Sequence, residues 1–340
     1  PGTGLDLWEN DREVFELVDP NGDVKDTVIY ERYAGAPTGV ANPESAIWGE
    51  FGSVDGLDQM SWSRWLDGVD TNDNGRDFGR RRETPGATNL GTGSVITAYV
   101  PPDVDGLSPG TAISSLVGSF VGGLVINPAD TGTMLGVDDV NPNVIPASPE
   151  GGNCIVAWDP SGGGNMVASN DIMTGNASYD LWVYFDTSDI TVAGAESTAY
   201  GIMGTTDYVF NWADPGGTLL PTTNVTSNGS TGLAWIFNKD NAGQVKRLFL
   251  VDAKGGGDSS PNGGSMDWTI HQTIDMSAVA SGWYRLSISY ASDGSVTAIF
   301  NTQTFNFTST AGLKGGFYVG YRESLSGTPT SLRPPTFDRR

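Results

Sequence analysis

The fold is decided by residues 283–321, which read WYRLSISYASDGSVTAIFNTQTFNFTSTAGLKGGFYVGY. The first run alternates apolar with polar residues, the period-two pattern of a strand with one buried face, and its apolar members are Tyr284, Leu286, Ile288 and Tyr290. Asp293-Gly294 then marks a hairpin turn, because glycine accepts the positive φ of tight turns. Further runs at 296–300, 305–307 and 317–321 complete an antiparallel meander. Since such a meander has one apolar face, we expect a second sheet to cover it.

Composition indicates the same structural class for the whole chain. The 340 residues include 47 glycines, and only 17% of the residues are charged. Patterns with a helical period are nearly absent, so an all-β protein with many tight turns is expected. We predict a β domain at residues 1–89, a linker at 90–94, a second β domain at 95–325 and an extended tail at 326–340.

The charge balance limits the possible partners. Asp and Glu number 40 against 18 Lys and Arg, a formal net charge of -22, which repels phosphate backbones and anionic membrane surfaces. The sequence contains no run of 18 apolar residues, so no membrane span is predicted. Cys154 is the single cysteine, so no intrachain disulfide forms, and it is expected to be a buried, inert thiol. These features, with a start at Pro1 that indicates processing or a fragment, favour an extracellular or cell-surface location.

Motifs in the first domain follow a recognisable order: residues 19–22, 26–30, 61–64, 67–74, 77–78 and 84–89. This order resembles the second half of a lamin-tail domain as found in bacterial surface proteins. The resemblance implies an immunoglobulin-like β-sandwich whose opening strands are missing, because only residues 1–10 stand in their place. A sandwich that lacks strands has an open edge.

From residue 151 at least eight strand-like segments follow one another: 154–158, 179–185, 198–203, 208–212, 233–238, 245–251, 269–275 and the meander. This spacing predicts a two-sheet sandwich. The runs at 180–186, 282–290 and 316–321 resemble the concanavalin A-like, laminin-G-like jelly roll, a fold that hosts lectins, glycosidases and spacers alike. Residues 103–150 are either outer strands of this domain or a surface excursion.

A candidate calcium loop lies in the first domain. Its pattern Asp-x-Asn-x-Asn-Gly at 70–75 is the first half of a loop whose alternate oxygen ligands converge on a hard cation. Position twelve is Arg81 instead of Glu, so other acids must substitute. The predicted calcium ligands are Asp67, Asp70, Asn72, Asn74 and Asp77. The alternative is a solvated loop of Asx turns.

Candidate glycan-binding residues lie in the second domain. Trp212 and Trp268 are suited to stacking on sugar rings, although Trp is also favoured inside sandwiches. Asp258 belongs to the glycine-rich loop 254–264, which either holds calcium or a sugar or simply connects strands. This loop lacks the Gly-Lys-Ser/Thr of a phosphate loop, which excludes nucleotide binding there.

Motifs of common hydrolases are absent. The chain has no Gly-x-Ser-x-Gly elbow, no His-Glu-x-x-His and no cysteine dyad. Jelly-roll glycosidases resemble one another in a Glu-x-Asp-x-x-Glu strand, which supplies their paired carboxylates. This motif is also missing. His271 is the only histidine, and its strand-like setting predicts a structural role. We therefore expect a protein that is not an enzyme.

The leading functional prediction is a secreted or cell-surface structural protein that self-associates, with strand complementation into a filament as the mechanism. Residues 1–10 are the expected donor strand, because Pro334 and Pro335 in the tail cannot donate ladder hydrogen bonds. The alternative is a calcium-assisted, glycan-binding adhesion module. A third interpretation is a spacer domain of a larger surface protein.

Overall fold

The structure is a computed structural model. It describes residues 13–30, 60–64, 66–70, 72, 74–82, 84–89, 94–108, 111, 124–126, 145–157, 166–169, 171–190, 193–205, 231–240, 244–254, 267–309, 313–325 and 336–340. Apart from the four-residue helix α1 (Asn74–Asp77), the elements are strands. The all-β class is therefore confirmed.

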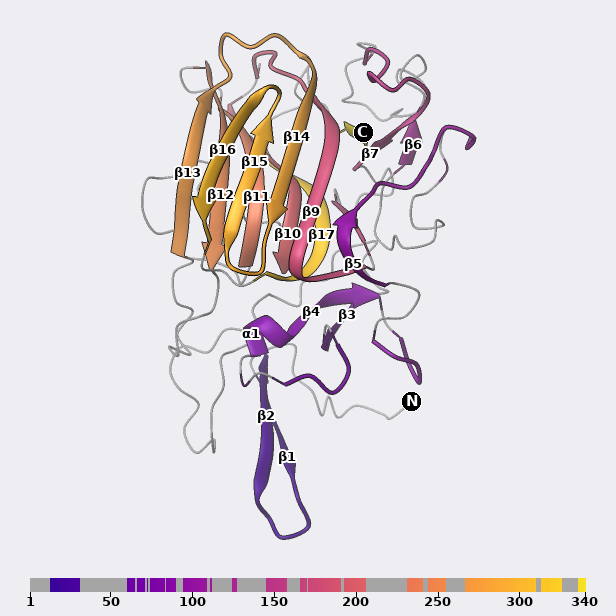
Figure 1. Cartoon of the computed structure of the whole chain (residues 1–340), viewed down its shortest axis with the longest axis vertical. Helices are drawn as coiled ribbons and strands as arrows, with labels where there is room; N and C mark the ends of the chain where they lie inside the picture. The colour runs from indigo at the N-terminus through magenta and orange to yellow at the C-terminus, as the bar shows by residue number, and fades with distance from the viewer. Residues whose placement is uncertain are drawn as a thin grey trace.

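Two small sheets make up the described part of the first domain. One is the hairpin of β1 (Glu13–Val18) and β2 (Val24–Tyr30), and the other pairs β3 (Met60–Arg64) with β4 (Phe78–Arg82). The first hairpin extends away from the rest of the molecule (Figure 1). Its turn is fixed by the Asp19 carboxylate, which accepts hydrogen bonds from the backbone N–H groups of Asn21 and Asp23 at 2.8 and 3.0 Å. These pairs do not display an immunoglobulin-like sandwich, so the lamin-tail resemblance stays a prediction.

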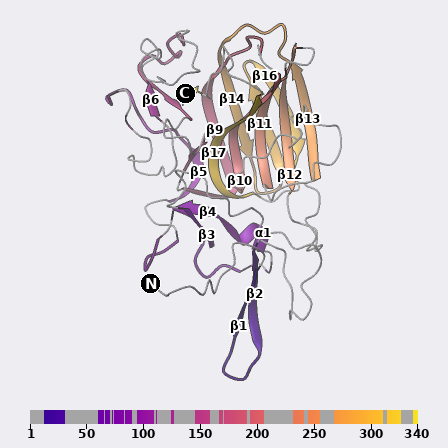
Figure 2. The same cartoon turned by 180° about the vertical axis from the view of Figure 1, so that it is seen from behind.

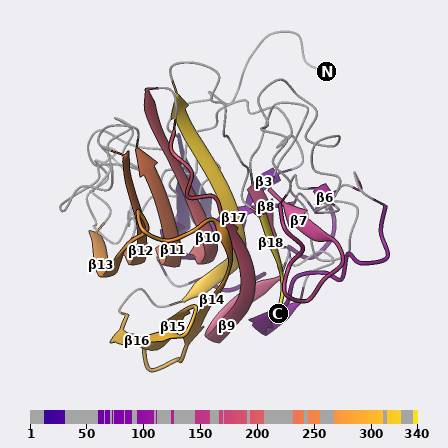
Figure 3. The same cartoon turned by 90° about the horizontal axis from the view of Figure 1, so that it is seen from above.

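The rest of the molecule is a β-sandwich of two layers. The front layer runs β16 (Gln303–Thr308), β15 (Ser295–Phe300), β14 (Gly282–Tyr290) and β9 (Ile172–Phe185). The back layer runs β13 (Asp267–Asp275), β12 (Val245–Lys254), β11 (Thr231–Asp240), β10 (Gly194–Thr205) and β17 (Lys314–Leu325). Figure 2 shows the back layer from behind, and Figure 3 shows both layers from above.

Short strands extend the front layer beyond β9. They are β5 (Val95–Tyr99), β18 (Thr336–Arg339), β7 (Cys154–Val156) and β6 (Leu124–Ile126), while β8 (Met166–Ala168) pairs with β17 in the back layer. The β5–β9 pair is parallel, and the other pairs are antiparallel. Part of the expected tail is thus a strand of the sheet, and Arg339 holds it in place by ion pairs with Asp103 and Asp105 at 2.7 and 3.1 Å.

The hydrophobic core fills the space between the layers. The Phe185 ring lies 5.2 Å from Tyr200 and 5.1 Å from Phe237 in edge-on contacts, the geometry that aromatic pairs prefer. The indole N–H of Trp235 in the back layer donates to the carbonyl of Ser287 in the front layer at 3.2 Å. The predicted inward face of β14 is confirmed, because its apolar residues Leu286, Ile288 and Tyr290 are buried.

The middle of the back layer, along β11 and β12, is buried on both of its faces. In β11, Trp235 faces the core and its neighbours Ala234 and Ile236 point the opposite way, yet all are fully buried. Phe249 and Val251 of β12 follow the same pattern. Unbroken apolar runs such as residues 233–237 are typical of strands covered on both sides. An open ligand surface is therefore to be sought on the front layer.

Most of the predicted strands are present. The segments 179–185, 198–203, 233–238, 245–251 and 269–275 lie within β9 to β13, and the segment 154–158 is longer than β7 (Cys154–Val156). The predicted strand at 208–212 and the candidate donor at 1–10 lie outside the described residues. No helix in the described part of the chain is long and apolar enough to cross a membrane. The division into domains stays a prediction.

Candidate functional site

An open groove lies on the outer face of the front layer, where β5, β9, β14 and β15 meet. Its volume is about 380 Å³, which falls within the range of ligand pockets. The groove is lined by Ala98, Tyr99, Val100, Ser178, Tyr179, Asp180, Arg285, Ser287, Ile288, Ser289, Thr297, Ile299 and Arg340.

The polar members come together because the strands alternate and their register is fixed. Side chains next to one another along a strand point to opposite faces. While Leu286 and Ile288 enter the core, their neighbours on β14 face outward. The register places Ser287 opposite Asp180, and Ser289 opposite both Ser178 and Thr297. Directly opposed side chains lie within contact distance, so one row of hydroxyl groups, Ser178, Ser289 and Thr297, crosses three strands, and Ser287 lies beside it.

Charged side chains occupy one end of the groove. Arg285 donates from Nε and Nη2 to the two carboxylate oxygens of Asp180, at 2.9 and 2.7 Å. Arg340 donates from Nη1 to the same carboxylate at 2.7 Å. Donation to the Asp180 carboxylate raises the pKa of Arg285 above its usual range, so the Arg285 side chain stays charged. One carboxylate therefore positions two guanidinium groups.

An aromatic side chain adjoins this charged end. The Arg340 guanidinium lies 5.8 Å from the centre of the Trp182 ring, within the range of a cation–π contact. The indole N–H of Trp182 donates to Glu150 at 3.2 Å, which fixes the orientation of the ring. Across the groove, Val100 is 68% exposed and forms an apolar rim. The groove thus combines a row of hydroxyl groups, a charged end and an apolar surface.

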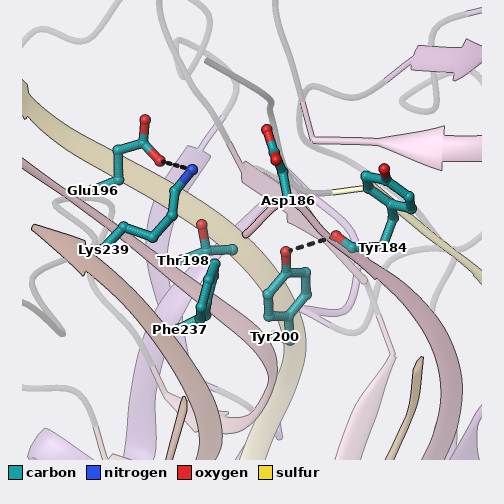
Figure 4. Close-up of a pocket in the computed structure, with 7 residues that line it drawn as sticks. All are labelled: Tyr184, Asp186, Glu196, Thr198, Tyr200, Phe237 and Lys239. Carbon is teal, nitrogen blue, oxygen red and sulfur yellow. Dashed lines mark hydrogen bonds and ion pairs between the residues drawn. The ribbon is translucent and has the colours of Figure 1, made fainter. Parts of the chain in front are cut away.

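A second, much smaller pocket lies at the end of the core (Figure 4). Glu196 and Lys239 form an ion pair of 3.0 Å there, and both side chains are almost fully buried. The hydroxyl of Tyr200 donates to the carbonyl of Tyr184 at 3.4 Å, and burial raises the pKa of this phenol well above its usual range. The space of about 10 Å³ admits one water at most. This pocket is part of the packing and is too small for an organic ligand.

Two of the predicted calcium ligands, Asp70 and Asp77, lie beside an arginine side chain, together with Asp26. Arg64 lies 3.3 Å from Asp77, 3.6 Å from Asp70 and 2.8 Å from Asp26. Its other contacts are the carbonyl of Val69 at 3.0 Å and the face of Phe78 at 4.6 Å. Within the described residues, no group of three or more His, Cys, Asp or Glu side chains is placed to hold a metal ion.

The remaining predicted ligands make hydrogen bonds to other groups of the protein. The Asn74 amide donates to the carbonyl of Thr27 at 2.8 Å, and Asp67 accepts the backbone N–H of Asn89 at 3.0 Å. Asn72 has a positive φ of 54° and donates its N–H to Asp70 at 2.9 Å, which is an Asx turn. The contact between Asp70 and Asn72 matches the Asx turn of the alternative, whereas Asn74 and Asp77 are buried and not solvated. Calcium binding stays a prediction.

The side chains of the predicted glycan residues are not among those that the structure describes. Trp212 and Asp258 lie outside the described residues, and Trp268 belongs to β13 with a side chain that is also outside them. Sequence reasoning missed the groove residues Asp180, Arg285 and Arg340. Because polar residues of β14 alternate with buried apolar ones, the sequence pattern does predict that Arg285 faces outward. Its partner Asp180 lies 105 residues away, and Arg340, which shares that carboxylate, lies 55 residues further along the chain. Only the register of the strands brings the three residues together.

His271 and Cys154 both serve the packing. The His271 ring stacks on Phe307 at 3.7 Å, which joins the outermost strands of the two layers. Its Nε2 lies 3.8 Å from the Asp252 carboxylate. Burial lowers the pKa of His271, and the nearby Asp252 opposes this shift. Cys154 is fully buried, and burial raises the pKa of its thiol far above the usual range, so the thiol is not reactive.

Comparison with known proteins gives similarity of fold. No family model matches the chain, and no curated protein sequence does. An alginate lyase from Chlorella virus is 11% identical, with 57% of this chain and 85% of the other covered and a TM-score of 0.32. A carbohydrate-binding module from Bacillus subtilis is 12% identical, with 57% of this chain and 87% of the other covered and a TM-score of 0.22. Chicken galectin 2 is 8% identical, with 48% of this chain and 91% of the other covered and a TM-score of 0.21. At TM-scores of this size the similarities carry no argument about this chain, and the concanavalin A-like resemblance goes no further than the two-layered β-sandwich that the described strands form.

The expectation that the chain is not an enzyme is wrong. The solved structures similar to it include alginate lyases, a carbohydrate esterase and a κ-carrageenase. The sandwich is thus shared with enzymes, and the motifs missing from the sequence exclude only the catalytic families that those motifs define. The similarity assigns no reaction to this chain.

Proposed function

We propose that this protein binds glycans in the groove on the outer face of the front layer. The observation that carries the proposal is the convergence of hydroxyl and charged side chains from several strands in one open groove, beside an aromatic ring. Sugars present many hydroxyl groups, each of which donates and accepts hydrogen bonds, and serine and threonine hydroxyls do the same. A rigid sheet holds such groups in place, which limits the entropy lost on binding.

The opposite side of the sandwich supports this choice of surface. There the outward side chains in the middle of β11 and β12, namely Ala234, Ile236, Phe249 and Val251, are apolar and buried, so this part of the surface offers neither access nor polar groups. On the front layer, Ser289 and Thr297 are exposed, and Asp180 and Arg285 are partly exposed. A glycan ligand also suits the predicted extracellular or cell-surface location.

A glycan array with the whole chain tests the proposal. Ser289→Trp places an indole in the groove and is expected to abolish the signals that the wild type gives. The matched control is Ser277→Trp, which changes an exposed turn residue outside the groove and should bind as the wild type does. Equal binding by both variants would place the site elsewhere. Sizing each bound glycan after incubation shows whether cleavage accompanies binding.

We propose self-association as a second function, on the evidence of the projecting hairpin. The sheet of β1 and β2 pairs with no other strand in the described part of the chain, and its Leu17 and Val18 are 64% and 48% exposed. Isolated two-stranded hairpins are marginally stable, and their open edges are templates for pairing. Such a hairpin gains stability from a partner.

A second copy of the chain offers a suitable acceptor for the hairpin. Among the described strands, β5 pairs only with β9, and Val95 and Val100 at its ends are 54% and 68% exposed. Contact between two different surfaces of identical copies produces a chain of molecules. Light scattering should therefore show large species for the wild type and monomers for Leu17→Lys. Monomers for both proteins would contradict self-association.

A further inference from the structure

We infer that the groove selects glycans that carry an isolated anionic group, a carboxylate or a sulfate, on an otherwise neutral saccharide. This inference rests on the proposed function and adds the class of ligand. It starts from the charges in the groove. Asp180, Arg285 and Arg340 are the ionised side chains of its lining, and the other lining residues are serine, threonine, tyrosine or aliphatic. Since burial raises the pKa of Tyr99 and Tyr179, both phenols stay neutral, and the lining is net positive.

The hydrogen bonds of the two arginines show that donors remain. A guanidinium group has five N–H donors and no acceptor. Arg285 uses Nε and Nη2, and Arg340 uses Nη1, all on the single carboxylate of Asp180. The other N–H groups of both side chains have no partner among the described residues. Both side chains are partly exposed, at 26% and 38%, so these donors are open to a ligand.

Asp180 also determines where these donors lie. It holds Arg285 by two hydrogen bonds and draws Arg340 toward the Trp182 ring. Fixed, planar guanidinium groups bind carboxylate and sulfate oxygens by paired, charge-assisted hydrogen bonds. Asp180 is in this view a positioning residue, and the two arginines are the ligand contacts. The neighbouring row of hydroxyl groups then binds the neutral part of the saccharide.

The net charge of the chain restricts the density of charge on the ligand. A protein of charge -22 repels polyanions over distances of about 8 Å in physiological salt. The net positive lining of the groove compensates for one nearby anion and does not compensate for a row of them. A single acidic sugar in a neutral glycan therefore fits better than a polyuronate or a highly sulfated chain.

Matched glycan pairs test the inference. Isothermal titration with the whole chain compares 3′-sialyllactose and lactose 3′-sulfate with lactose, and aldobiouronic acid with xylobiose. We expect at least one acidic member to bind about tenfold more tightly than its neutral partner at low salt, and this preference should decrease as salt is added. The sialylated and sulfated arms distinguish the carboxylate from the sulfate. Equal binding of acidic and neutral members would overturn the inference and leave the proposed function intact, whereas no binding in any pair or on the array would overturn both.

Variants locate the selectivity in the groove. Arg340→Gln should lose about tenfold in affinity for the acidic member of a pair and less than twofold for the neutral member. Arg340→Lys keeps the charge and loses the planar guanidinium group, so its affinity for the acidic member should lie between those of the wild type and Arg340→Gln. Lys25→Gln makes the same change of charge in the distant hairpin, where the side chain is 52% exposed, and should bind as the wild type does. Equal losses for Arg340→Gln and Lys25→Gln would show a general charge effect and overturn the inference. Melting curves verify that each variant is folded.

Discussion

Two arginine–carboxylate clusters in this molecule have opposite stoichiometry. In the first domain Arg64 is surrounded by Asp26, Asp70 and Asp77, and its side chain is only 15% exposed. In the groove the single carboxylate of Asp180 is shared by Arg285 and Arg340, in contact with solvent. Arg64 uses Nη1 and Nη2 on Asp77, Asp26 and the carbonyl of Val69, and so it fastens the structure. A carboxylate shared by two arginines leaves donors free, and these are available to a ligand.

The largest effect is expected at the enclosed cluster. Arg64→Ala leaves the carboxylate of Asp77, which is 1% exposed, without its guanidinium partner. Breaking a buried ion pair on one side costs about 3 kcal/mol or more, so the first domain should unfold at much lower denaturant concentration. Urea titration followed by proteolysis between β2 and β3 measures this loss. An unchanged midpoint would show that Arg64 does not fasten this domain.

A smaller loss of stability is expected at the groove. Asp180→Asn weakens the hold on Arg285 and Arg340, but these groups remain hydrated, so the free energy of unfolding should fall by about 1 kcal/mol or less. Thermal melting measures the change, and Asp293→Asn in an exposed turn serves as the control. A loss as large as that of Arg64→Ala would contradict the distinction between a fastening cluster and a binding cluster.

The pair of His271 and Asp252 predicts how stability depends on pH. Burial lowers the pKa of His271 in the folded protein, so the unfolded chain binds the proton more readily. Stability is therefore complete above the unfolded pKa of about 6.5, is lost as the pH falls through that value, and levels off below the folded pKa. His271→Phe preserves an aromatic ring against Phe307 and should flatten this part of the pH profile. The same profile in both proteins would contradict the assignment to His271.

The smallest effect is expected from chelation. If residues 67–77 bind calcium as their pattern predicts, EDTA should lower the melting temperature. Because the guanidinium of Arg64 already lies among carboxylates of this loop, we expect the shift to be smaller than the effects above. Differential scanning calorimetry in calcium and in EDTA measures it. A shift greater than that of Asp180→Asn would show a metal site of real strength.

The sequence predicted local features far better than contacts between distant segments. Alternation at 284–290 and the Asp293-Gly294 turn are determined by neighbouring residues, and both match β14 and the turn before β15. The groove depends on which strands lie side by side. Arg340 reaches Asp180 across 160 residues because β18 inserts beside β9, and nothing in the 326–340 composition predicts that position. The Asp-x-Asn pattern likewise indicates oxygen ligands, but not that Arg64 from another strand lies among them.

The most direct test of the account is a crystal structure of the protein with the glycan that binds best on the array. The account predicts the saccharide in the groove on the outer face of the front layer, with an anionic oxygen about 3 Å from an N–H group of Arg285 or Arg340. The neutral part should lie over Ser287 and Ser289. A glycan bound elsewhere on the molecule, with these two arginines still paired only to Asp180, would contradict it.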